Sequence, residues 1–257
     1  MFWLNKEEEQ NRKDAAKRIA SAKKTIALTG AGISVASNIM PFRGKGGLWE
    51  KYDPEEVAEI NSFLKNPAKS WAFLKEMQKV VEKARPNPAH ISLAKMEELG
   101  YLASIITQNV DGLHQEAGNK VVIEFHGNTR RLVCLECRKL YPSEDISLDA
   151  LPPYCPSCGG LLKPDVVLFG EPIPGAALMQ ARLEVQQCEV MLIVGTSGLV
   201  EPAASLPSAA KRNGAFIVEI NPERTVLTAT VANIFLQGRA EEILPLLADE
   251  LSAIKEG

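Results

Sequence analysis

Four of the five cysteines in this sequence have the spacing of metal ligands. They form two Cys-x-x-Cys pairs, Cys134 with Cys137 and Cys155 with Cys158. Each pair can place two thiolates on one ion, and four thiolates complete the tetrahedral shell of a zinc ion. A redox-active pair is the alternative, but redox chemistry does not require two such motifs in one short stretch. Because four sulfur ligands leave no open coordination position, we expect one structural zinc ion and expect the fifth cysteine, Cys188, to be an ordinary core residue.

A glycine-rich turn follows a short β-rich run near the N-terminus and has the composition of a phosphate-binding loop. Backbone N–H groups in such a turn can hold phosphate oxygens. Phe42 and Arg43 follow close by, and an arginine there can bind a phosphate through two hydrogen bonds. A tight structural turn is the alternative, because the third glycine of a dinucleotide-binding fingerprint would fall at Val35. The residues of this candidate cofactor loop are Gly30, Ala31, Gly32, Ile33 and Ser34.

Polar or glycine residues also follow the later β-rich runs. Parallel strands bring such positions to one edge of a sheet, so we expect one extended cofactor site there. Asp111 can also cap a helix, and His126 can be a hydrogen-bonded structural residue. If His126 faces a substrate, however, its imidazole is suited to general-base catalysis near neutral pH. The residues at these strand ends are Gln108, Asn109, Val110 and Asp111, then His126, then Gly195, Thr196 and Ser197, and then Asn221, Pro222 and Glu223.

The elements that position these residues alternate between strands and helices. We expect buried strands at 25–29, 102–107, 121–125, 190–194 and 216–220. Helical patterns lie between and around them, at 7–22, 88–99, 176–187, 202–212 and 240–254. This alternation is typical of an α/β fold whose parallel sheet is covered by helices on both faces.

Two stretches interrupt the alternation, and we expect them to form a smaller second domain. Residues 39–87 carry helix-like segments, and residues 128–165 hold the four paired cysteines. The remaining segments, 1–38, 88–127 and 166–257, are then the large domain.

The composition excludes several classes of protein. The 257 residues carry 29 basic and 32 acidic side chains, and a net charge of −3 argues against a nucleic-acid-binding protein. No apolar run approaches the roughly 20 residues that span a bilayer. The N-terminus lacks the basic and apolar regions of a secretory signal, so we expect a soluble cytoplasmic protein with no membrane partner.

Taken in order, these motifs resemble those of the sirtuins, the NAD-dependent protein lysine deacylases. The resemblance extends from about residue 22 to about residue 250. It rests on Gly30 to Ser34, Phe42-Arg43-Gly44, Thr107 to Asp111, His126-Gly127, the four paired cysteines, Pro164 to Glu171, Gly195-Thr196-Ser197 and Asn221-Pro222.

The resemblance implies a Rossmann-like large domain and a small domain made of a helical module and a zinc ribbon. NAD would lie between them as co-substrate, with its nicotinamide near Ile33, Asn109 and Asp111, and Ala240 would also contact the cofactor. An acylated-lysine protein substrate would add as a strand beside five residues. These five residues are Val167, Leu168, Phe169, Gly170 and Glu171.

The resemblance also implies a mechanism in which His126 and Asn109 are the catalytic residues. The acyl oxygen attacks the ribose as nicotinamide leaves, giving an alkylimidate. His126 then acts as general base for a ribose hydroxyl, and hydrolysis yields free lysine and O-acyl-ADP-ribose. Two other functions are consistent with the motifs: mono-ADP-ribosyl transfer to protein, and NAD sensing by a non-catalytic zinc-ribbon module.

The sequence departs from the family pattern in two places. In the cofactor loop Asn38 replaces a glycine and tolerates a positive φ, and Pro41 replaces a polar residue. Leu74 and Met77 stand where sirtuins that prefer succinyl groups have Tyr and Arg. An acyl carboxylate would be buried there without a partner, so we expect acetyl or longer apolar acyl groups.

Overall fold

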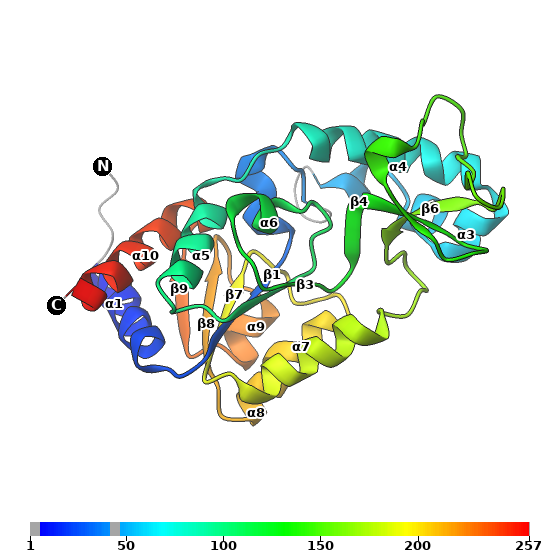
Figure 1. The fold of residues 1–257 in the computed structure, drawn as a ribbon. Coiled ribbons are helices and arrows are strands. Elements are labelled where there is room, and N and C mark those ends of the chain that lie inside the picture. The colour runs from blue at the N-terminus through cyan, green and yellow to red at the C-terminus, as the bar shows by residue number, and fades with distance from the viewer. Residues whose placement is uncertain (1–5, 42–46, 257) are drawn as a thin grey trace.

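The structure, a computed structural model, describes residues 6–41 and 47–256. Its larger part contains a six-stranded sheet in the order β3-β2-β1-β7-β8-β9, in which every neighbouring pair is parallel (Figure 1). The strands are β1 (Thr25–Thr29), β2 (Ser104–Thr107), β3 (Val122–Glu124), β7 (Val190–Val194), β8 (Phe216–Asn221) and β9 (Ile234–Gln237).

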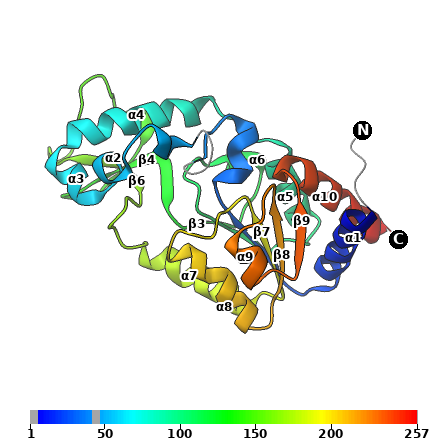
Figure 2. The same ribbon diagram turned by 180° about the vertical axis from the view of Figure 1, so that it is seen from behind.

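Helices cover both faces of this sheet, as Figures 1 and 2 show. The first face packs against α1 (Lys6–Ser21), α5 (Pro88–Glu98) and α10 (Ala240–Glu256). The second packs against α7 (Gly175–Gln187), α8 (Leu206–Arg212) and α9 (Val226–Thr230). All five residues of β7 are buried because both faces are covered. The predicted α/β fold is therefore confirmed.

Local sequence accounts for most of these elements. Helix α1 has acidic residues in its first turn, Arg18 in its last turn, and Ala15, Ala16 and Ile19 buried on one face. The helix expected at 202–212 begins with a 3₁₀ turn at Ala203–Ser205 before α8. The sixth strand, β9, was not predicted, because its apolar run is only a few residues long.

The smaller part combines an antiparallel sheet with short helices. The sheet has the order β5-β4-β6, with β4 at Gly127–Cys134, β5 at Leu140–Pro142 and β6 at Leu162–Val166. Beside it lie α2 (Pro54–Val57), α3 (Ile60–Lys65) and α4 (Pro67–Lys83) (Figure 2).

One apolar core joins the helices of the smaller part to its sheet. Phe63 and Trp71 are fully buried against Leu132 and Leu162, and the indole N–H of Trp71 donates to the carbonyl of Leu162 at 2.9 Å. The two segments that interrupt the α/β alternation therefore pack on each other.

Strands β4 and β6 carry the chain between the two parts. Gly127 pairs with Val166 and Asn128 with Asp165, and the register shifts between Asn128 and Leu132. Gly127 has a φ of 82°, and a Cβ there would lie 2.0 Å from the carbonyl oxygen of Asp165. Only glycine fits at this crossing, one residue after His126.

None of the helices in the described ranges has both the length and the apolar character needed to span a bilayer.

Candidate active site

The loops after β1 and β7 touch at the carboxyl edge of the large sheet. The N–H of Gly30 donates to the carbonyl of Val194 at 3.0 Å, and the N–H of Gly32 donates to Gly195 at 2.8 Å. A Cβ on Gly32 would lie 2.7 Å from the Cα of Gly195, so side chains there would push the loops apart. Since both N–H groups already have protein partners, the glycines provide close approach, and their contact with a phosphate stays a prediction.

A buried cluster of polar side chains lies beside this contact. Ser34 begins the cluster within the 3₁₀ helix Ala31–Ser37, and its hydroxyl donates to Asp111 Oδ2 at 2.7 Å. Asn109 Nδ2 donates to Ser34 Oγ at 3.0 Å and to the carbonyl of Gly30 at 3.2 Å. All three side chains are less than a tenth exposed, so their orientations are fixed.

Asp111 has two functions in this arrangement. Its Oδ1 accepts from the N–H of Leu113, the first residue of α6 (Leu113–Ala117), although the N-cap position itself is occupied by Gly112. Its Oδ2 faces the cofactor loop and accepts from Ser34.

His126 follows β3 and lies next to the end of β2. Its Nδ1 is 3.0 Å from the carbonyl oxygen of Gln108, which can only accept, so the neutral ring carries its proton on Nδ1. Its own carbonyl accepts from the N–H of Val167 at 2.9 Å. Burial lowers the pKa of His126 below its usual 6.5, and the hydrogen bond to Gln108 opposes this only in part. The ring is therefore neutral at pH 7, with Nε2 able to take a proton.

Side-chain hydrogen bonds also connect the ends of β2, β7 and β8. Gln108 Nε2 donates to Thr196 Oγ1 at 2.9 Å, and Asn221 Nδ2 donates to the carbonyl of Thr196 at 2.9 Å. Ser197, Pro222 and Glu223 are exposed beside them.

The remaining predicted cofactor residues lie in different settings. Val110 accepts the backbone N–H of Thr129 at 2.9 Å, and Ala240 is buried in the core at the start of α10. Phe42 and Arg43 lie outside the described residues. Asn38 has a φ of 63°, as predicted from its tolerance of the left-handed region.

Sequence reasoning missed Asn87, whose side chain is hydrogen-bonded to the cofactor loop. Its Nδ2 donates to the carbonyl of Ile33 at 2.8 Å and to Ser37 Oγ at 2.9 Å, and its Oδ1 caps α5. An Asn followed by Pro88 is a recognisable helix start, but its link to the loop requires the tertiary structure.

Two buried histidines, His90 and His114, lie next to each other near the end of β1. His114 Nε2 is 3.0 Å from Thr29 Oγ1, and the rings of His90 and His114 are 5.0 Å apart. Burial lowers the pKa of His90 to about 4 and that of His114 to about 3, so both rings are neutral at pH 7.

The predicted peptide-binding segment, Val167 to Glu171, runs between His126 and the helical module. The N–H of Phe169 donates to Ala58 at 2.9 Å, and its carbonyl accepts from Ile60 at 3.0 Å. One edge of this segment is therefore already paired at Phe169. On the opposite edge the N–H of Leu168 donates to Glu171 Oε2, and its carbonyl accepts from the N–H of Glu171, so pairing with an added peptide strand stays a prediction. The ring of Phe169 lies 6.2 Å from that of Trp49.

Leu74 and Met77, on α4, lie in apolar surroundings. Both pack against a small cluster that contains Val57, Ala58 and Phe73, and Leu74 also contacts the core of the smaller part.

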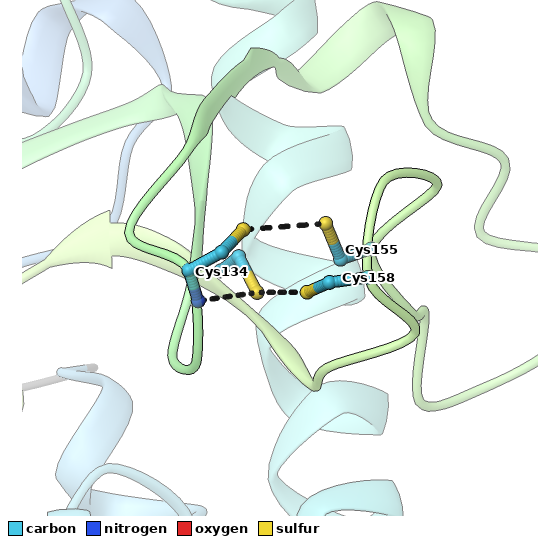
Figure 3. A group of neighbouring side chains, drawn as sticks. Cys134, Cys155 and Cys158 are labelled. Carbon is cyan, nitrogen blue, oxygen red and sulfur yellow. Dashed lines mark hydrogen bonds between the residues drawn. The ribbon is translucent and has the colours of Figure 1, made fainter.

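The four paired cysteines converge from the end of β4 with the turn that follows it and from the loop before β6 (Figure 3). Their sulfur atoms all lie within 4.8 Å of one another, with Cys134 and Cys158 at 3.5 Å and Cys137 and Cys155 at 3.8 Å. Zinc–sulfur bonds of about 2.3 Å in a tetrahedron place sulfurs roughly 3.8 Å apart, so the donor set fits one structural zinc ion. Cys188 is buried in the large core, as predicted.

A family model described as the Sir2 family matches residues 30–202. This chain belongs to the Sir2 family. Relatives of this Sir2 chain include NAD-dependent protein deacylase 2 of Pyrobaculum aerophilum, 47% identical over 93% of this chain and 95% of that protein. The NAD-dependent protein deacylase of Pyrococcus abyssi is 46% identical over 93% of this chain and 97% of that protein.

Solved Sir2 structures match this Sir2 chain closely. A Sir2 homolog–NAD complex is 43% identical with a TM-score of 0.88, covering 94% of each chain. A Sir2–p53 peptide–NAD+ structure is 36% identical with a TM-score of 0.85, covering 93% of this chain and 98% of that one.

Proposed function

We propose that His126 is the general base of this Sir2 chain, which is an NAD-dependent protein deacylase. One observation carries the assignment: a neutral imidazole, fixed by the carbonyl of Gln108, stands at the strand edge where the Ser34–Asn109–Asp111 cluster lies. With its proton on Nδ1, the ring has Nε2 free to accept a proton from a hydroxyl. The deacylase names and the NAD-bound structure among its relatives support the same reaction.

The residues that would hold NAD are those at the strand ends. When bound, NAD supplies the glycosidic bond that breaks as nicotinamide leaves. Asp111 and Asn109 are fixed by Ser34, and we assign them to the nicotinamide end. Thr196 and Asn221, which are joined to each other, are assigned to the ribose and phosphate end.

The acylated lysine would enter beside Val167 to Glu171. A peptide structure among the relatives supports this class of substrate. The apolar surroundings of Leu74 and Met77 favour an acyl group without a charge. The products would be free lysine and O-acyl-ADP-ribose.

A His126→Ala substitution tests the assignment. We expect a rate of deacylation at least 100-fold lower, because general-base catalysis contributes roughly 10²–10⁴ in rate. The affinity for ADP-ribose, measured by calorimetry, should change less than twofold. Near-wild-type deacylation by a folded variant would contradict the role of His126.

A further inference from the structure

A buried lysine lies where the small sheet meets the peptide-binding segment. Lys163, on β6, is only 4% exposed. Its ammonium group donates to the carbonyls of Pro164 and Val166 and to Glu171 Oε2, the last at 2.9 Å. A lysine has three N–H donors, so all of them are used inside the protein.

Glu171 uses one carboxylate oxygen atom to bind both Lys163 and the backbone of its own segment. Its Oε2 accepts from the N–H of Leu168 at 2.9 Å as well as from Lys163. The carbonyl of Val166 and the N–H of Leu168, on either side of Val167, are therefore both hydrogen-bonded to this ion pair. The N–H of Val167 itself donates to the carbonyl of His126. The chain is thus held on both sides at the point where it leaves β6 and becomes the peptide-binding segment.

Burying the charged group of Lys163 costs free energy, so its position in the structure calls for an explanation. Lysine is almost never fully buried unless it is paired, and removal of one partner leaves an uncompensated charge. Neither Lys163 nor Glu171 takes part in the proton transfer proposed for His126. The hydrogen bonds of the pair instead end on backbone groups of residues 164–168.

We propose that Lys163, through Glu171, is a positioning residue that holds Val167 to Glu171 in the shape that receives the acyl-lysine peptide. This inference rests on the proposed function of that segment. Lys163 does not touch the substrate; it acts on the backbone that does. A merely structural role would weaken the whole protein and change cofactor and peptide binding together, whereas a positioning role changes peptide binding alone.

The test compares two lysine-to-methionine variants. Lys163→Met keeps the length and apolar bulk of the side chain but removes its three donors. Lys69→Met is the matched control, because Lys69, on α4 of the smaller part, forms an exposed ion pair with Glu56 at 2.7 Å. The dissociation constant of a fluorescent acetyl-lysine peptide, its KM, and the dissociation constant of ADP-ribose are measured for each variant.

We expect Lys163→Met to weaken peptide binding and raise the peptide KM at least tenfold, with ADP-ribose binding changed less than twofold. Lys69→Met should change none of these values more than twofold. Peptide binding within twofold of wild type in folded Lys163→Met, or an equal loss of peptide and ADP-ribose binding, overturns the inference.

Two further outcomes have to be distinguished: a Lys163→Met variant that does not fold, and a wild type that does not deacylate the peptide. If Lys163→Met does not fold, Lys163→Gln keeps an amide N–H donor and removes the charge. Peptide binding at least threefold weaker, with ADP-ribose binding unchanged, supports the inference, and a smaller change overturns it. If the wild type binds the peptide without deacylating it, the proposed function fails while the binding comparison still tests Lys163. A wild type that binds no acetyl-lysine peptide overturns both.

Discussion

At the residue scale, the environment of His126, the proposed general base, determines its protonation state. Burial lowers the pKa of this ring, and the carbonyl of Gln108 selects the tautomer with a free Nε2. A general base works only in its unprotonated form, so activity is lost as the pH falls through the pKa of the ring.

We therefore expect kcat/KM to rise with pH through an apparent pKa below 6.5 and to be flat from pH 7 to 8. A pH–rate profile with a saturating NAD concentration measures this. An acid limb with its midpoint above 6.5 would show that another group, or a His126 without the lowered pKa, controls the rate.

At the scale of elements, a buried carboxylate fixes the short helix α9 against the sheet. Glu219, on β8, is fully buried and forms no ion pair within the described part of the chain. Its two oxygens accept from the hydroxyls of Thr225 and Thr228, each at 2.6 Å. Leu227, between these threonines, packs where a Cβ on Gly198 would lie, so α9 supports the loop after β7.

Thr228→Val and Thr228→Ser separate the hydroxyl from the methyl group. Valine keeps the shape but leaves one buried carboxylate oxygen without a donor, at a cost of about 1–3 kcal/mol in the free energy of unfolding. Serine keeps the donor and should cost less than about 1 kcal/mol. Urea unfolding measures both, and a valine variant as stable as the serine variant would argue against the role of Glu219.

The sequence was sufficient to predict strands with continuous apolar runs, such as Val190–Val194, because their burial follows from composition. It also predicted that the strand ends lie together, since parallel strands bring those positions to one edge of the sheet. It did not identify Asn87 or Lys163. A lysine in a strand is normally expected to be exposed, and its burial here depends on how Glu171 folds back toward it.

At the scale of the whole molecule, the cysteine cluster borders the apolar core that joins the two halves of the smaller part. Cys134 and Cys155 belong to the same core as Phe63 and Trp71. Zinc binding in such a site is coupled to folding, because the four sulfur ligands come together only in the folded chain.

Removal of zinc by a chelator should therefore open this core and abolish deacylation. We expect tryptophan emission to shift to longer wavelength as Trp71 becomes exposed, and zinc added back should restore both signals. A metal-free sample with unchanged activity and emission would contradict a structural role for the ion.

The central claim concerns the reaction that the two parts perform together. Mass spectrometry of the products formed from NAD and peptides carrying acetyl-, octanoyl- or succinyl-lysine tests it most directly. We expect nicotinamide, free lysine peptide and O-acyl-ADP-ribose. Acetyl and octanoyl should be consumed faster than succinyl, because the proposed acyl-binding residues Leu74 and Met77 lie in apolar surroundings. ADP-ribose attached to protein, with the acyl groups intact, would contradict the account.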